Sequence, residues 1–246
     1  MIKILLFGIS GGLGRAITED FLNRYENVSI YCPTRSPVDL NELKLSENQR
    51  VQLLSWNSEN EQSYDDISSH LKDANITLDF CISAIGALHS DNITPEKKLG
   101  HLNPNQMMWY FHANAIVHAL IIKHFSSLMN KKKASIMGLL SARVGSIGDN
   151  KLGGWYSYRA AKAALNMIIK TGAIEMKRYN KNLSIIGIHP GTVDTALSKP
   201  FQAHVPDHKL FTPKFAADAI FKNILDQVTS ENSGYVFAYD GQIIPE

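Results

Sequence analysis

Short runs of apolar, often β-branched residues alternate along this chain with longer segments in which apolar residues recur at helical spacing. This alternation is typical of strand, helix, strand units, in which crossover helices join parallel strands. Seven strands are predicted, at residues 2–7, 28–32, 51–54, 78–83, 135–140, 183–188 and 235–239. Helices are predicted at residues 13–25, 63–72, 105–129, 157–179 and 213–226. Because the strands are almost continuously apolar, we expect helices on both faces of one parallel sheet.

The chain has 246 residues, 44% of them hydrophobic, with no repeat or obvious linker, so we expect residues 1–246 to form a single α/β domain. Lys and Arg number 25 against 23 for Asp and Glu, and this formal charge of +2 argues against a nucleic-acid partner. The apolar run at residues 4–7 ends at Gly8. It is too short for a signal peptide or a membrane span, which predicts a cytoplasmic protein without membrane contact.

The cysteines and histidines give no reason to expect a metal or redox site. Cys32 and Cys81 each fall in a predicted buried strand, which favours a structural role for both. His112, His118 and His124 recur on one predicted helix. A step of six residues turns successive side chains about 240° apart, so the three rings cannot bind one metal ion.

A glycine-rich turn directly follows the first predicted strand and runs straight into a helix, as Gly8-Ile9-Ser10-Gly11-Gly12-Leu13-Gly14. Glycines let the backbone turn tightly and approach a pyrophosphate, whose charge then lies at the positive end of the helix. The turn therefore predicts a dinucleotide site, although an ordinary tight turn remains the alternative. Its spacing differs from the common G-x-G-x-x-G fingerprint. The expected contacts come from Gly8, Ser10, Gly11, Gly12, Leu13 and Gly14.

The end of the second predicted strand distinguishes between the two dinucleotides, because an acidic residue there binds a ribose hydroxyl and a basic one a 2′-phosphate. The sequence at this point is Cys32-Pro33-Thr34-Arg35, with no carboxylate. Arg35 therefore favours NADP (NADPH) over NAD. Arg15 is a second candidate cation, with an ordinary surface arginine as the alternative.

Tyr158 and Lys162 stand four residues apart at the start of a predicted helix and therefore share one face. Hydride transfer to a carbonyl leaves an alkoxide that needs a proton. A tyrosine supplies it if its pKa, about 10, is lowered, and we expect the Lys162 ammonium and an oxidised nicotinamide to lower it together. The alternative is a half-buried tyrosine beside a lysine that reaches solvent.

Taken together, the glycine-rich turn and Tyr158-x-x-x-Lys162 resemble the short-chain dehydrogenase/reductase (SDR) family over essentially the whole chain. Asn114 and the segment His189-Pro190-Gly191-Thr192-Val193-Asp194-Thr195 extend the resemblance. Residues 141–147 and 153–159 and the ending Tyr239-Asp240-Gly241 are similar to the C-factor-like and small carbonyl reductase branch. The resemblance implies a Rossmann-type doubly wound fold.

The resemblance also implies roles for the matching residues. Tyr158 would be the proton donor or acceptor and Lys162 its electrostatic partner, which also donates to the nicotinamide ribose. Ser141 would donate a hydrogen bond to the substrate oxygen, and Asn114 would hold a water linked to Lys162. Thr195 would contact the nicotinamide carboxamide. The remaining cofactor residues expected are Asn57, Ala84, Gly86, Pro190, Gly191 and Val193.

Three departures from the family pattern are visible. Phe7 stands where threonine usually precedes the first glycine. Ser83-Ala84-Ile85-Gly86 replaces the sequence N-N-A-G. The usual Ser-Ser pair is Ser141-Ala142, and Ser141 is farther from Tyr158 than is common. Asn57 is the candidate for the adenine contact after the third strand.

These features predict an NADP(H)-dependent oxidoreductase that reduces a small carbonyl compound or oxidises the corresponding alcohol. The alternative is a dinucleotide-binding regulatory or signalling protein of C-factor type with little turnover; a sugar-nucleotide epimerase is disfavoured because little chain follows the seventh strand. The loop at 196–212 predicts an apolar or aromatic substrate, since it contains Phe201, His204, Val205, His208 and Phe211. By the resemblance, the helices at 105–129 and 157–179 would form the contact of a homodimer or homotetramer.

Overall fold

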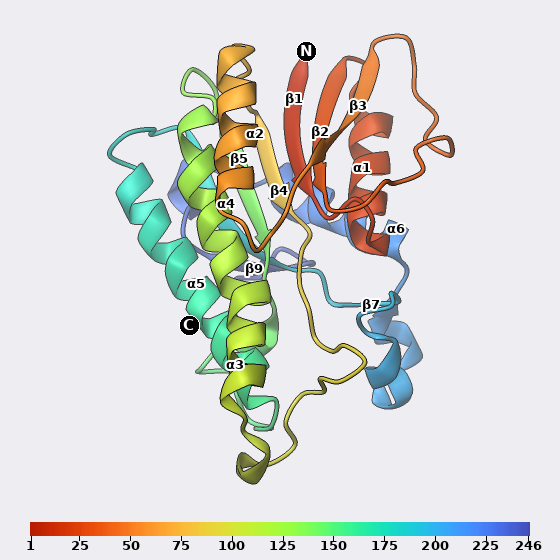
Figure 1. Cartoon of the computed structure of the whole chain (residues 1–246), viewed down its shortest axis with the longest axis vertical. Coiled ribbons are helices and arrows are strands. Elements are labelled where there is room, and N and C mark those ends of the chain that lie inside the picture. The colour runs from red at the N-terminus through yellow and green to blue at the C-terminus, as the bar shows by residue number, and fades with distance from the viewer.

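The computed structural model describes the backbone of residues 1–246 and every side chain except that of His204, which lies outside the description. Seven parallel strands form one sheet in the order β3-β2-β1-β4-β5-β6-β9, which confirms the predicted sheet (Figure 1). The strands are β1 Ile2–Phe7, β2 Val28–Thr34, β3 Gln49–Ser55, β4 Phe80–Ser83, β5 Ser135–Leu140, β6 Leu183–His189 and β9 Val236–Ala238. A separate pair, β7 Thr192–Val193 and β8 Leu210–Phe211, was not predicted.

The strand order reverses its direction of growth between β1 and β4. The chain first adds β2 and β3 on one side of β1 and then returns to place β4 on the other. Phe7 and Ser83 are paired at the carboxyl ends of these strands, and the Ala84 amide donates to the Phe7 carbonyl at 2.9 Å. A reversal of this kind is where open α/β sheets bind ligands, because the two following segments diverge and leave a crevice.

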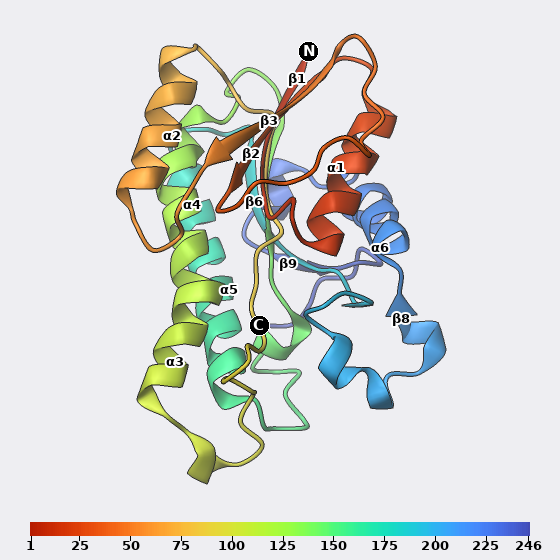
Figure 2. The same cartoon turned by 45° about the vertical axis from the view of Figure 1, so that its right-hand side comes forward.

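Helices cover both faces of the sheet. One face carries α1 (Gly12–Arg24) and α6 (Pro213–Ile220), and the other carries α2 (Gln62–Asp73), α4 (Val117–Phe125) and α5 (Tyr156–Met176), as Figures 1 and 2 show. The remaining helix, α3 (Pro104–Phe111), extends beyond the sheet beside α5. Short 3₁₀ helices lie at Leu99–His101, Ser126–Leu128, Arg143–Gly145, Lys199–His204, Asp207–Lys209 and Ser230–Asn232.

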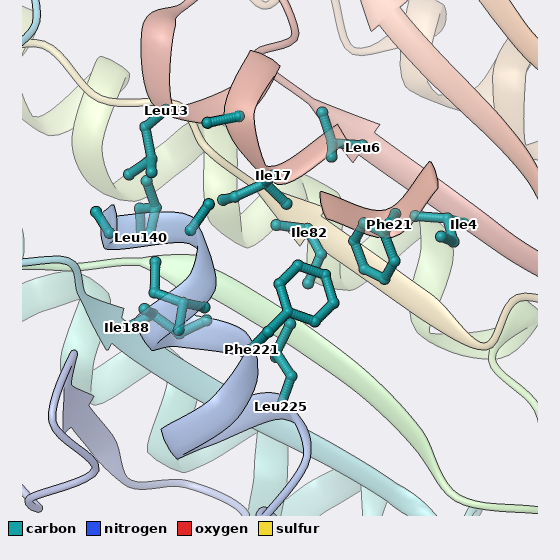
Figure 3. Packing of buried hydrophobic residues seen from close by; sticks show 14 of the residues in the cluster. Ile4, Leu6, Leu13, Ile17, Phe21, Ile82, Leu140, Ile188, Phe221 and Leu225 are labelled. Atoms are coloured by element: carbon teal, nitrogen blue, oxygen red, sulfur yellow. The ribbon is translucent and has the colours of Figure 1, made fainter. Parts of the chain in front are cut away.

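The sheet separates two hydrophobic cores. Successive side chains of a strand point to opposite faces, so Leu6 enters the core beneath α1 and α6 while Leu5 enters the core beneath α2, α4 and α5. In the first core the rings of Phe21 and Phe221 meet edge to face, with centroids 4.6 Å apart (Figure 3). With both faces covered, the strands are buried throughout their centre, and only the ends of the sheet remain for a ligand.

Two predicted helices are less regular than their sequence pattern indicates. The helix expected at 105–129 contains a π turn at His112–Ile116 between α3 and α4, and the helix expected at 213–226 ends in a π turn at Phe221–Leu225. A π turn is a single wider turn inside an α-helix, and over so few residues the apolar periodicity does not distinguish it from the α-helix around it. The ends of several predicted strands also move by one or two residues, as is usual for element boundaries.

Both cysteine thiols are buried, and burial raises the pKa of Cys32 to about 12, which agrees with the structural role predicted for them. His118 is fully buried, whereas His124 lies beside Glu61 with Nε2 3.1 Å from a carboxylate oxygen. Within the described residues, no three His, Cys, Asp or Glu side chains are grouped so that they could hold a metal ion. None of the described helices is both long and apolar enough to span a bilayer.

Candidate active site

The glycine-rich turn is shaped by contacts that exclude side chains. Gly8 has a φ of 96°, and a Cβ atom on it would lie 2.9 Å from the carbonyl oxygen of Ala84. A Cβ on Gly14 would lie 2.0 Å from the carbonyl oxygen of Gly8. Gly11 closes the turn by donating its amide to the Gly8 carbonyl at 3.0 Å. Helix α1 then begins at Gly12 with no cap from a described side chain and no acidic residue in its first turn, so its amides are available to an anion.

The segment after β6 folds back over this turn. The Cγ2 atom of Thr195 lies 3.2 Å from the place that a Cβ of Gly12 would take. Gly191 has a φ of 77°, and a Cβ on it would lie 2.5 Å from the ring of Phe211. The structure thus brings together Thr195 and Gly12, two predicted residues that follow different strands. Val193 is buried next to this contact.

The side chains predicted to bind the adenine end of the nucleotide and to distinguish NADP from NAD differ in their surroundings. Arg35 is exposed just after β2, and no described carboxylate forms an ion pair with it. Arg15 is engaged, because its guanidinium lies 3.2 Å from Glu19 and 3.4 Å from Glu42. Asn57 is exposed after β3, where its side-chain oxygen accepts the amide of Glu59 at 3.0 Å. Arg35 is therefore the less engaged of the two candidate cations.

Tyr158 and Lys162 lie together on the buried face of α5, with 7% and 2% of their surfaces exposed. The Lys162 Nζ atom donates to the Leu140 carbonyl at 2.8 Å and lies 5.9 Å from the centre of the Tyr158 ring. Burial lowers the pKa of Lys162 to about 7 and raises the pKa of Tyr158 above its usual value. Both shifts arise because burial penalises the charged form of each group, and the predicted joint effect of Lys162 and an oxidised nicotinamide on the Tyr158 pKa stays a prediction.

Asn114 is buried in the π turn between α3 and α4. Its Oδ1 atom accepts the Ala87 amide at 3.1 Å, and its Nδ2 atom donates to the carbonyls of Ala87 at 2.8 Å and Tyr110 at 3.1 Å. A Cβ on Gly86 would lie 3.5 Å from Asn114 Oδ1 and 3.7 Å from Lys162 Nζ. Because Gly86 has no side chain, a small space remains between the two predicted residues Asn114 and Lys162.

Ser141 is placed differently from what its predicted role requires. Its hydroxyl donates to Asn166 Oδ1 at 2.5 Å. Asn166 lies two helical turns beyond Tyr158, which corresponds to about 12 Å along α5. Ala142, the next residue, packs against the hydrophobic cluster that contains Tyr158. The structure therefore brings Tyr158, Lys162 and Asn114 together but turns the Ser141 hydroxyl to another partner, and the role of Ser141 stays a prediction.

Four aromatic rings form what we call the aromatic wall beside Tyr158: Tyr110, Trp155, Phe201 and His89. The ring centroids of Tyr110 and Trp155 lie 6.0 and 6.1 Å from that of Tyr158. Phe201, from the predicted substrate loop, lies 5.3 Å from Trp155 and 5.7 Å from His89. His89 was not predicted, because it reaches the site through chain folding and stands in no recognised motif. Trp155 lies in the segment 153–159 that resembles the C-factor-like branch, but no site role was predicted for it.

The buried acid Glu96 was not predicted from the sequence. Glu96, only 2% exposed, lies in the loop of residues 84–103 that leads from β4 to α3 (Figure 1). Its carboxylate accepts the Ser157 amide at 3.1 Å and the Ser157 hydroxyl, and its backbone carbonyl accepts the Trp155 amide at 2.6 Å. Glu96 and Ser157 are 61 positions apart, so no local sequence pattern predicts their contact. The loop that begins at the carboxyl end of β4 thus returns to the residues on both sides of Tyr158.

Comparison with known proteins agrees with this arrangement. A family model described as short chain dehydrogenase matches residues 3–206. The chain is 28% identical over 244 residues to 1-hydroxy-2-glutathionyl-2-methyl-3-butene dehydrogenase of Rhodococcus sp. strain AD45, with 99% of both chains covered. It is also 30% identical over 106 residues to the C-signal of Myxococcus xanthus, which covers 43% of this chain and 58% of that protein.

Solved structures share the fold. The carbonyl reductase Sniffer of D. melanogaster superposes with a TM-score of 0.81 at 19% identity and full coverage of both chains. A short-chain dehydrogenase/reductase from Burkholderia multivorans with bound NADP has a TM-score of 0.76 at 21% identity, covering 100% of this chain and 99% of that chain. The chain belongs to the short-chain dehydrogenase family and is an oxidoreductase, as predicted. Proteins of this family bind NAD(P).

Proposed function

We propose that this oxidoreductase reduces small carbonyl compounds with NADPH, and oxidises the corresponding alcohols in the reverse direction. The observation that carries the proposal is the buried pair of Tyr158 and Lys162 at the carboxyl edge of the sheet, with Asn114 beside Lys162. Two buried titratable groups whose pKa values are displaced by their surroundings are typical of a site for proton transfer.

The residues around the glycine-rich turn fit a dinucleotide. Bare backbone at Gly8 and Gly14 and the uncapped start of α1 offer amides to a pyrophosphate. Thr195 lies over Gly12, on the side of the turn where we place the nicotinamide end of the nucleotide. Arg35, exposed and without an acidic partner among the described side chains, favours a nucleotide with a 2′-phosphate. When bound, the nucleotide supplies the hydride.

The proton would come from the Tyr158 hydroxyl. Burial keeps that hydroxyl protonated, so Tyr158 is a donor at neutral pH until an alkoxide, a much stronger base, forms beside it. Lys162, with a pKa of about 7, can gain and lose a proton near neutrality. The space beside Gly86, bordered by Asn114 Oδ1 and Lys162 Nζ, suits a water that restores the proton.

The aromatic wall bears on the substrate. Trp155 and Phe201 present ring edges next to Tyr158, which favours a carbonyl carrying an apolar or aromatic group. Ser141 would assist by donating to the substrate oxygen, as the family resemblance implies. That role requires its hydroxyl to leave Asn166 when substrate binds.

The test is a binding and turnover experiment on the purified protein. NADPH and NADH are titrated by fluorescence, and NADPH oxidation is followed with alkyl and aryl aldehydes and ketones. Wild type is compared with Tyr158→Phe and with Tyr179→Phe, a control at an exposed tyrosine. We expect tighter binding of NADPH than of NADH, and turnover that falls by about 10²- to 10⁴-fold only in Tyr158→Phe.

Three other outcomes would count against the proposal. Failure of both nucleotides to bind would contradict the dinucleotide site. Binding without turnover of any carbonyl would favour a regulatory protein whose nucleotide occupancy controls a partner. Undiminished turnover in Tyr158→Phe would exclude this tyrosine as the proton donor.

A further inference from the structure

The way in which α5 begins is unusual for a helix. Its N-cap position is Trp155, whose side chain has no oxygen to accept the free amides of the first turn. By contrast, α3 is capped by its own Asn103, whose side-chain oxygen accepts the amides of Asn105 and Gln106 at 2.9 and 3.2 Å. At α5 the capping group is the distant Glu96 carboxylate. The helix that carries Tyr158 therefore depends on another segment of the chain for its first turn.

The backbone in front of α5 is also held in an uncommon conformation. Gly153, Gly154 and Trp155 have φ values of 64°, 66° and 52°, three left-handed residues in succession. A left-handed tryptophan is strained and persists only where the surroundings fix it. The Glu96 carbonyl holds the Trp155 amide, and the Arg159 side chain donates to the Gly153 and Gly154 carbonyls at 3.2 and 2.9 Å.

Burial of the Glu96 carboxylate has a cost that a surface cap would avoid. Two donors from Ser157 and the positive end of α5 compensate for it. Ser157 and Trp155 flank Tyr158 on two sides, one as its neighbour in sequence and the other through the ring contact. A carboxylate kept in this position at such a cost points to a requirement for geometry at Tyr158.

We propose that Glu96 is a positioning residue, which holds Ser157 with its carboxylate and Trp155 with its backbone carbonyl and so fixes Tyr158 where its proton is transferred. This inference rests on the proposed function. The Glu96 carboxylate is buried and acts, in this proposal, through Ser157 and Trp155. Trp155 belongs to the aromatic wall and also occupies the N-cap position of α5, where its side chain cannot accept a hydrogen bond. Glu96 therefore caps the helix in its place.

The experiment compares Glu96→Ala, Glu96→Gln and the control Asn103→Ala, which removes a cap from α3 in the same region. For each variant kcat, KM, the NADPH Kd and Tm are measured with the best carbonyl substrate. Small displacements of a reacting group cost up to about 10²-fold in rate. We therefore expect Glu96→Ala to lower kcat by about 10- to 100-fold with the NADPH Kd within about twofold. Glu96→Gln, which keeps one acceptor oxygen, should recover most of this loss.

The control separates positioning from stability. Asn103→Ala should lower Tm similarly but leave kcat within about twofold, since a missing surface cap has only a stability cost. Equal kcat losses in Asn103→Ala and Glu96→Ala would overturn the proposal, as would an unchanged kcat in Glu96→Ala. If Glu96→Ala does not fold, Ser157→Ala, which removes the hydroxyl that donates to Glu96, decides the matter by the same kcat criterion.

A readout without turnover keeps this inference separable from the proposed function. In protein labelled with ¹³C-tyrosine, the Tyr158 signal is identified by its absence in Tyr158→Phe. We expect Glu96→Ala to shift or broaden this signal, while Asn103→Ala leaves it in place. An unmoved Tyr158 signal in Glu96→Ala would overturn the positioning role. If wild type reduces no carbonyl, the proposed function fails, yet the spectrum still shows whether Glu96 fixes Tyr158.

Discussion

The glycine-rich turn after β1 and the loop after β4 are neighbours at one edge of the sheet, yet they are built in opposite ways. The turn relies on bare backbone: Gly8 and Gly14 approach so closely that side chains do not fit. The loop relies on side chains that join distant segments, since Asn114 binds both backbone groups of Ala87 and Glu96 reaches the start of α5. One region offers open amides to solvent, and the other is held by hydrogen bonds from the buried side chains of Asn114 and Glu96.

The difference agrees with the roles proposed for the two regions. A charged nucleotide must enter and leave, and backbone amides with an exposed Arg35 suit this because they need no rearrangement. Proton transfer requires groups that stay in place away from bulk water, and the buried Tyr158 and Lys162 meet that need. Four predictions test whether the two regions also differ in what substitutions do to stability, nucleotide binding and turnover.

The largest effect should come from the turn. Gly14→Ala places a Cβ atom 2.0 Å from the Gly8 carbonyl oxygen, so the backbone must shift. We expect a loss of at least about 3 kcal/mol in the free energy of unfolding in urea, with loss of NADPH binding. Gly100→Ala is the matched control, because a Cβ there meets nothing within 4 Å. Similar urea midpoints for the two variants would contradict the account of the turn.

The next effect concerns the buried region. Asn114→Leu removes three hydrogen bonds and leaves the backbone groups of Ala87 without partners. We expect a loss of about 2 to 3 kcal/mol in unfolding free energy and a decrease of about 10²-fold in kcat. Asn182→Leu, which loses one exposed bond to the Lys131 carbonyl, serves as the control. A variant of Asn114 with unchanged stability would show that this region is less tightly bonded than described.

Lys162 allows a test through pH. Burial moves its pKa from 10.5 to about 7, so between these values the folded protein binds fewer protons than the unfolded chain. Stability should then rise with pH from about 7 toward 10, and the cost of burying the ammonium is fully present below pH 7. Lys162→Met should be more stable than wild type by roughly 2 kcal/mol at pH 6, with the gap closing toward pH 10, as followed by thermal unfolding.

An exposed lysine provides the comparison for this measurement. Lys151→Met changes the same chemical group at the surface, so its stability difference from wild type should not depend on pH in this way. A gap for Lys162→Met that stays constant between pH 6 and 10 would contradict the lowered pKa.

The smallest effect should be at Arg35. Replacing this exposed arginine by serine should weaken NADPH binding about tenfold, which corresponds to about 1.4 kcal/mol, and leave NADH binding unchanged. The NADPH affinity of Arg35→Ser should also depend less on salt. Arg178→Ser removes an exposed charge far along the chain and should alter neither affinity. Equal losses for NADPH and NADH would contradict recognition of a 2′-phosphate.

The sheet and the two main motifs could be predicted because their signals are local. Each strand is a continuous apolar run, the glycine-rich turn is seven consecutive residues, and Tyr158 and Lys162 are one helical turn apart. The seven strands were all found, although their ends moved. The family resemblance added Asn114, which the structure places beside Lys162.

What was missed depends on burial or on contacts between distant segments. Burial raises the pKa of Tyr158 in the chain without a nucleotide, and the extent of burial is not visible in a sequence. The Glu96 contact with Ser157 joins two loops that only the finished fold brings together. The partner of the Ser141 hydroxyl depends on which side of β5 it faces, and a one-residue difference exchanges Ser141 for Ala142.

The contact between Thr195 and Gly12 also bears on how the protein is made. A chain leaves the ribosome from its N-terminus, and domains begin to fold in that order. The glycine-rich turn therefore emerges early, whereas Thr195, which covers it, follows β6. A nascent chain that stops short of β6 has the turn without its cover. The proposed nucleotide pocket is complete only when most of the polypeptide has been synthesised, so a truncated chain has an unfinished pocket.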